Sequence, residues 1–259
     1  MLDVIICEFC KWKRKRLFQI AYFTSFIMPL LYSMILSDCD LDDMMSVVRE
    51  ENGFLILIPF TVVIAAHLFF EEQDNDTLKN LMCVPVSKSR IVFAKLFVLL
   101  LFGVAYELAG FGITAVLAVA KGVSLEHWGL QLLLTIGTGI LLWAAAMPCI
   151  LLVIWFNKSY IISVIIAFTY TVLGYILHIS DAFLMVPLGL NVATFLPVSM
   201  IFRWLYQFHS LEGAGNQMID FYQRFSPYFV STQTVVAILL AEALACMGLM
   251  MKIYQKQSV

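Results

Sequence analysis

Residues 129–156 read GLQLLLTIGTGILLWAAAMPCILLVIWF and contain no charged side chain. About 20 consecutive apolar residues are enough for a helix to cross the hydrocarbon core of a bilayer. A soluble domain could not bury this stretch together with the other apolar runs of the chain inside a single core. Residues 129–156 therefore predict a transmembrane helix, and the chain is expected to be a membrane protein.

The composition of the whole chain points the same way. Its 259 residues are 62% hydrophobic and 13% charged, whereas soluble domains have roughly 45–50% and about 25%. These values exclude a soluble enzyme, a secreted disulfide scaffold and a disordered tail. The six cysteines are scattered, so neither a disulfide framework nor a metal site is expected. The net charge of −2 gives no reason to expect nucleic acid as a partner.

Further apolar runs on either side of residues 129–156 predict five more spans. We therefore expect an all-α polytopic membrane protein in which residues 17–259 form one six-span domain. The predicted spans are about 17–36, 53–70, 91–120, 129–156, 160–178 and 229–251.

The residues before the first span have a pattern of their own. In residues 1–16, apolar side chains recur at helical spacing from Leu2 to Trp12, with lysines and arginines clustered behind them. This pattern is typical of an amphipathic helix that lies in the membrane interface. The alternative is that these residues only begin the first span.

The segment before the last span, residues 179–228, allows two interpretations. Residues 182–205 are apolar but are interrupted by prolines, Gly189 and Arg203, so they could be an extra span or a pair of broken, re-entrant helices. Basic residues concentrate on the cytoplasmic side of membrane proteins. With six spans and both termini in the cytoplasm, most of the 16 basic residues lie inside. This bias favours an external, re-entrant segment at 179–228.

Between the second and third spans lies the polar stretch 71–90, EEQDNDTLKNLMCVPVSKSR. Asp76 or Thr77 can cap a short helix that ends before Pro85. Leu78 and Leu81 then share one face, which could dock on a soluble partner. The alternative is an ordinary solvated loop.

The motifs of this stretch resemble those of ABC-2 type ABC-transporter permeases. They are an acidic pair, then T-L-K-N-L at 77–81, P-V-S-K-S-R at 85–90, and A-K at 94–95. The segment E-F-C-K-W-K-R-K-R at 8–16 is similar to the interfacial helix of that family. Lys88 makes the P-x-S-R pattern one residue longer than in the family. Among its branches, the chain is most similar to the bacitracin-resistance and lantibiotic-immunity permeases.

The resemblance implies a homodimer in the bacterial plasma membrane, each copy seated on a cytoplasmic ATPase that binds ATP and magnesium. It implies export of a peptide antibiotic; another cargo (sodium, a lipid or a small drug) and a non-transporting sensor subunit are the alternatives. The chain has no G-x-x-x-x-G-K-[ST] motif, so ATP hydrolysis is expected from a partner chain, and this chain is expected to be no enzyme and to hold no cofactor. The residues that the resemblance assigns to ATPase coupling are Glu71, Glu72, Asp76, Thr77, Leu78, Leu81 and Pro85.

Two carboxyl groups, Glu107 and Glu242, fall inside predicted spans. An intramembrane carboxylate costs about 2.5–3.5 kcal/mol on insertion scales, so it normally faces protein or a water-filled cavity. These residues either line a substrate path, with His178 and Arg203, or are protonated or hydrogen-bonded to neighbouring spans. The acidic stretch 37–52 is expected to be a solvated outer loop, or else a surface that attracts cationic peptides.

An intramembrane enzyme is the rival class of protein. A lipid phosphatase would need clustered Arg, His and Ser motifs of the P-S-G-H kind, and a glutamate-type membrane protease would need E-E-x-x-x-R. Neither motif occurs in the chain. The sequence therefore favours a permease.

Overall fold

The computed structural model describes residues 2–13, 15–35, 40–74, 87–156, 160–209, 211 and 215–256. These residues form helices and no strand, and six helical segments among them are long and apolar enough to cross a membrane. The predicted all-α polytopic fold is confirmed.

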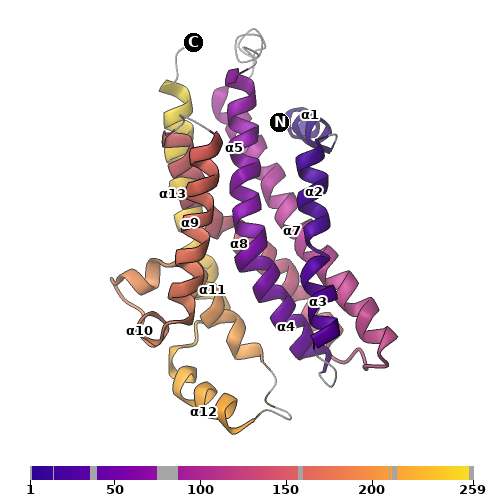
Figure 1. Ribbon diagram of the computed structural model, residues 1–259. Coiled ribbons are helices and arrows are strands. Elements are labelled where there is room, and N and C mark those ends of the chain that lie inside the picture. Colours follow the sequence, from indigo (N-terminus) through magenta and orange to yellow (C-terminus); the bar gives the residue numbers. More distant parts are fainter. Residues whose placement is uncertain are drawn as a thin grey trace.

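The spans run side by side, and both termini lie at the same end of the bundle (Figure 1). Helix α1 (Leu2–Lys13) lies across that end, where an interfacial helix is expected, and packs on α7. The six spans are α2–α3 (Arg16–Thr24 and Ile27–Ile35), α4–η1–α5 (Leu41–Glu51, Asn52–Leu57 and Ile58–Asp74), α7 (Lys88–Ala120), α8 (Trp128–Phe156), α9 (Tyr160–Ile179) and α13 (Thr232–Lys256).

The second span begins earlier than predicted. The expectation of a solvated outer loop over 37–52 is wrong for residues 41–51, because Leu41–Glu51 is helical and continues into α5 through the π-helix η1. Leu41, Met44 and Met45 recur at helical spacing and are buried beside Ala118 of α7. Carboxylates are interspersed among these apolar residues, so the stretch has no apolar run that would have predicted a span from the sequence.

No helix in the described part of the segment between α9 and α13 is long enough to span a bilayer. The longest in the apolar region, α11, has 9 residues, a rise of roughly 13 Å. It packs against α8, α9 and α13 at the end of the bundle opposite the termini (Figure 1). The chain thus leaves α9 and enters α13 at the same end, as the re-entrant interpretation expects. The short helices are α10 (Asp181–Leu184), η2 (Val192–Phe195), α11 (Pro197–Leu205), η3 (Tyr206–Phe208), α12 (Asn216–Phe225) and η4 (Ser226–Tyr228).

Helices α7 and α8 approach each other closely where glycines face. A Cβ atom added to Gly139 would lie 2.9 Å from the Cα atom of Val104 and 3.2 Å from the carbonyl oxygen of Gly103. Both contacts are with backbone, which cannot move aside as a flexible side chain can. The glycine therefore sets the distance between the two central spans.

We expect Gly139→Ala to lower the free energy of unfolding by about 1–3 kcal/mol, the usual cost of overpacking. Gly112→Ala on α7 is the matched control, because a Cβ atom there has nothing within 4 Å. That control should gain about 0.5–1 kcal/mol from its better helix propensity. Unfolding of both variants in detergent measures the difference; equal stabilities would contradict the close approach.

Candidate functional site

A buried group of polar side chains lies between the outer parts of α4, α7 and α8, toward the end opposite the termini. We call Asp42, Arg49, Glu50, Glu107 and Gln131 the polar cluster. Arg49 is 5% exposed and Glu107 3% exposed, so both ionisable side chains are shielded from solvent. Ionisable groups buried within a membrane bundle normally have a functional or a pairing role.

Hydrogen bonds connect the cluster across two spans. The Arg49 guanidinium donates from Nη2 to Oε1 of Gln131. The Gln131 amide in turn donates to Oδ1 of Asp42 over 2.9 Å, and Nδ1 of His127 lies 3.3 Å from the other oxygen of Asp42. Gln131 on α8 thus holds the guanidinium that α4 carries.

Other atoms of the cluster have no hydrogen-bond partner among the described residues. They are buried, and they include Oε1 of Glu107, Oε1 of Glu50, Nε of Arg49 and, nearby, Oδ1 of Asn52. Three carboxyl groups attract the positive charge of Arg49: that of Glu107 most strongly, followed by those of Glu50 and Asp42. A buried polar atom without a partner costs about 1–3 kcal/mol. The cluster therefore retains hydrogen-bonding capacity that a polar ligand or water could use.

Local backbone structure brings the cluster together. Asn52 begins the π-helix η1, and π-helical turns are frequent at functional sites. Asn52 donates from Nδ2 to the carbonyl oxygen of Ser25, at the break between α2 and α3, over 3.0 Å. A Cβ atom added to Gly110 would lie 2.9 Å from the same Nδ2, and one added to Gly53 would lie 3.3 Å from Oε1 of Glu107. The two glycines thus allow η1 and α7 to approach.

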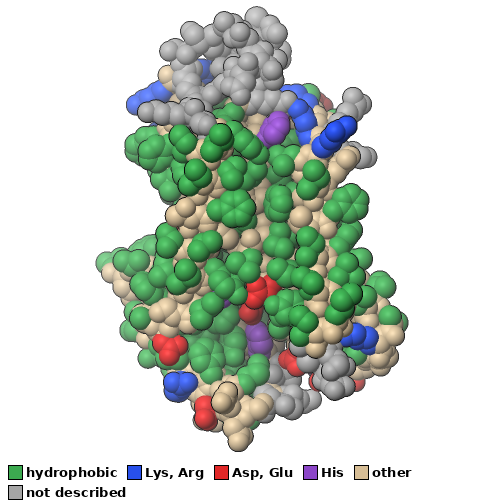
Figure 2. Space-filling model, viewed as in Figure 1, with side chains coloured by type: hydrophobic (Ala, Val, Ile, Leu, Met, Phe, Trp, Pro, Cys, Tyr) green, Lys and Arg blue, Asp and Glu red, His purple; other side chains and the backbone are tan. Residues whose placement is uncertain are grey.

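The external segment closes one side of the cluster. Nε2 of His209 lies 3.6 Å from Oε1 of Glu50, and its ring stacks on Tyr206 with centroids 4.4 Å apart. Burial, and then the positive charge of Arg49, lower the pKa of His209 to about 4. His209 is therefore neutral at pH 7. Figure 2 shows acidic side chains and a histidine together at one place on the otherwise apolar side of the bundle.

This lowered pKa predicts a pH dependence of stability. Between about pH 6.5 and pH 4 the unfolded chain binds a proton at His209 that the folded chain does not bind, so stability should fall as pH falls through this window. His209→Asn should remove that part of the loss. His127→Asn, at an exposed histidine, is the matched control. The unfolding temperatures of the unaltered chain and of both variants are measured at pH 7 and pH 5. If the unfolding temperature fell equally in all three proteins, His209 would not be the cause of the pH dependence.

The predicted substrate-path residues do not all meet. Glu107 belongs to the cluster. His178 borders it through two steps: its ring packs on Tyr175, whose hydroxyl donates over 2.9 Å to Glu51, the residue after Glu50. Arg203 is buried elsewhere and donates from Nε to the carbonyl oxygen of Tyr228, joining α11 to the segment before α13.

Glu242 is also separate from the cluster. It lies half-buried on α13, and its Oε2 has no hydrogen-bond partner among the described residues. The groups with which its carboxylate interacts electrostatically are Tyr170 on α9 and Cys246 on its own helix. The structure thus gives Glu107 and Glu242 different surroundings.

The coupling residues predicted from the sequence lie outside the described side chains. They are Glu71, Glu72, Asp76, Thr77, Leu78, Leu81 and Pro85. The structure describes the helices on either side, α5 to Asp74 and α7 from Lys88.

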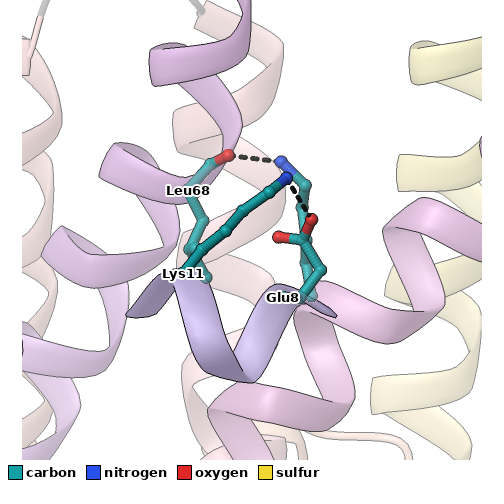
Figure 3. Close-up of polar contacts among 4 residues, drawn as sticks. Glu8, Lys11 and Leu68 are labelled. Carbon is teal, nitrogen blue, oxygen red and sulfur yellow. Dashed lines mark hydrogen bonds and ion pairs between the residues drawn. The ribbon is translucent and has the colours of Figure 1, made fainter. Parts of the chain in front are cut away.

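At the base of this segment, α1, α5 and α7 meet (Figure 3). Nζ of Lys11 lies 2.7 Å from Oε1 of Glu8 on α1. The fully buried Lys95 of α7 donates from Nζ to the carbonyl oxygen of Leu68 on α5 and lies 5.1 Å from the ring centroid of Phe69. The contacts of Lys95 thus join α5, which precedes residues 75–86, to α7, which follows them.

Trp12 fixes α1 to this base. It is buried, and its ring centroid lies 4.9 Å from that of Phe18 and 5.9 Å from that of Phe102 on α7. The amphipathic helix is thereby attached to the third span as well as to the first.

Sequence reasoning missed Arg49, Glu50, Gln131 and His209. The first two lay in the stretch that was interpreted as a loop, although apolar residues at 41, 44, 45 and 48 carried a helical period. Gln131 is a single polar residue in an apolar run. His209 is brought to Glu50 only by the path of the external segment, for which the sequence holds no signal.

Six apolar spans with ionisable groups buried between them define a polytopic membrane protein. The family model described as ABC-2 family transporter protein matches residues 4–174, more than half of the chain. The chain therefore belongs to the ABC-2 transporter family, and it is a transmembrane permease. No curated protein matches it. The matched region includes most of α1, the 71–90 segment and the polar cluster.

Proposed function

We propose that this permease exports peptide antibiotics of the bacitracin or lantibiotic type from the bacterial plasma membrane, driven by a separate ATPase chain. The membership in the ABC-2 family carries the transport role. The coupling motifs at 71–90, together with the lack of a phosphate-binding loop in the chain, support the separate ATPase, which would supply ATP and magnesium.

The distribution of charge supports cytoplasmic termini. Basic residues concentrate at the cytoplasmic ends of membrane spans, and more of the described ones lie at the end with the termini (Figure 2). Those at that end are Lys11, Lys15, Arg16, Lys88, Arg90, Lys95, Lys252 and Lys256, and those toward the other end are Arg49, Lys121, Arg203 and Arg224.

The uneven burial of the spans supports a homodimer. In the most apolar stretch of the first span and in that of the fifth, only 17% is buried inside the protein, whereas in that of the second span 78% is buried. The outer surfaces of α2, α3 and α9 therefore remain available to lipid and to a second copy of the chain.

The same two helices that flank the coupling segment also reach the polar cluster. Lys95 and Glu107 lie on α7, twelve residues or roughly 18 Å apart; Leu68 and Asn52 lie on the continuous second span. If ATP binding moves the coupling segment, the second span and α7 shift relative to each other. The position of Arg49 relative to Glu107 then changes, and the cluster opens or closes.

The cluster and the external segment also fit a cargo that acts at the outer face. Acidic side chains at Asp42, Glu50 and Glu51 would attract a cationic or amphipathic peptide, and the apolar surroundings would accept its lipid-like part. Expulsion would then proceed from the membrane rather than from the cytoplasm.

A strain that lacks this chain tests the proposal. It should become sensitive to bacitracin or to a lantibiotic, and resistance should return with the chain only when an active ATPase is also present. Sensitivity to sodium, lipid stress or a small drug alone would overturn the cargo but leave the permease. Loss of gene induction without loss of efflux would instead support a sensor subunit.

A further inference from the structure

A cleft of about 570 Å³ lies between the ends of α8 and α13, at the end of the bundle that carries the termini. It is far from the polar cluster, and the proposed function does not use it. Its lining residues are Leu151, Trp155, Leu249, Lys252, Ile253, Gln255 and Lys256.

The cleft has an apolar wall and a basic rim. Trp155 is 70% exposed and Leu249 is 49% exposed, so large apolar surfaces face outward from both helices. Lys252 and Lys256 are one helical turn apart on α13, and both are exposed. An apolar wall next to two ammonium groups matches a molecule with an anionic head and a hydrocarbon tail.

Among the described residues, no acidic side chain lines the cleft. The nearest carboxyl group along α13 is Glu242, ten residues before Lys252 and therefore roughly 15 Å away. Within the described residues, no ion pair involves Lys252 or Lys256. No described neighbour therefore compensates the positive charge at the rim, which complements an anion.

We propose that this cleft binds an anionic phospholipid, with its phosphate on Lys252 and Lys256 and an acyl chain along Leu151, Trp155 and Leu249. Basic pockets between spans bind anionic headgroups, and tryptophan favours the level of the headgroups. The leaflet is the cytoplasmic one in the orientation proposed above; binding itself does not depend on the cargo or on the ATPase.

The apolar surface next to the cleft favours lipid over a soluble partner. Leu152 on α8, three residues before Trp155, is also exposed, so apolar surface extends beyond the cleft on that helix. A soluble protein could cover the lysines but would leave this surface in contact with hydrocarbon. One phospholipid satisfies both parts.

Brominated lipids, which quench tryptophan fluorescence on contact, test the site. The full chain is reconstituted in phosphatidylcholine vesicles that contain increasing fractions of brominated phosphatidylglycerol or brominated phosphatidylcholine. The signal of Trp155 is the difference between the chain and its Trp155→Phe variant. We expect phosphatidylglycerol to quench this signal at a severalfold lower mole fraction than phosphatidylcholine.

The variant Lys252→Gln/Lys256→Gln should lose this preference, so that both lipids quench Trp155 equally. Arg16→Gln/Arg90→Gln is the matched control, because it removes two exposed charges at the same end but outside the cleft, and it should keep the preference. Equal quenching by both lipids in the unaltered chain, or an unchanged preference in the lysine variant, would overturn the proposal. Absence of quenching by either lipid would also overturn it and assign the cleft to a second copy of the chain.

Discussion

Replacing Arg49 by Met is expected to lower the free energy of unfolding by about 1.5–3 kcal/mol, the cost of losing a buried hydrogen bond from a charged group. The guanidinium is the positive centre of the polar cluster, and it is held between α4 and α8 by its hydrogen bond to Gln131. Without it, Glu107 and Glu50 lose their compensating charge while they stay buried. Unfolding in detergent, followed by circular dichroism, measures the loss.

A double variant separates pairing from packing. Glu107→Gln alone removes one of three acidic neighbours of Arg49 and should cost less than Arg49→Met. In Arg49→Met/Glu107→Gln the two losses should fail to add, with an interaction energy of about 0.5–3 kcal/mol, as is usual for residues that belong to one polar network.

Arg224→Met is the matched control, since Arg224 is exposed on α12 and its loss should change stability by no more than about 0.5 kcal/mol. Strictly additive losses for Arg49 and Glu107, or an Arg49 variant as stable as the Arg224 variant, would show that the two residues do not act as a pair.

The spans could be predicted from the sequence because hydropathy alone determines which segments enter a bilayer. The part of the chain that the structure describes has six helical segments long and apolar enough to cross a membrane, the number predicted, and the apolar run that begins at Gly129 lies within α8, Trp128–Phe156. Helix ends were less predictable. Leu41–Glu51 carries many carboxylates, and its helical state depends on burial of Met44 and Met45 against α7, a tertiary contact.

The candidate site was only partly predictable for a similar reason. Glu107 stood out because a carboxyl group in a long apolar run is rare, and the structure places it in the polar cluster. Its partners come from α4 and α8, and no local pattern indicates that Arg49 and Gln131 meet across 82 residues of chain. His178 was found as a lone histidine at a span end, but its place at the border of the cluster depends on Tyr175 and Glu51.

Replacing Leu78 and Leu81 by Asp is expected to separate the permease from its ATPase while the bundle stays folded and inserted. The two leucines share one face of the predicted short helix, and burial of leucine at a docking surface is worth about 2 kcal/mol in favourable cases. Each substitution should weaken ATPase binding by about 30-fold. Resistance to the cargo should fall to that of a strain without the chain.

The folded state should survive because contacts among the described residues hold together the helices on either side of the segment. Lys95 joins α7 to α5 through the carbonyl oxygen of Leu68, and Trp12 fixes α1 against Phe102. Both contacts lie in the described residues that precede or follow residues 75–86. The variants should therefore reach the membrane at normal levels and unfold at the same temperature as the unaltered chain.

Asn80→Asp is the matched control, because it adds the same charge between the two leucines but on a different face of the helix. It should keep ATPase co-purification and resistance close to normal. Leucine variants that retain the ATPase and full resistance would refute docking through this face. If Asn80→Asp also abolished ATPase co-purification and resistance, the segment would be sensitive to added charge on any face. The docking surface would then have to extend around the helix.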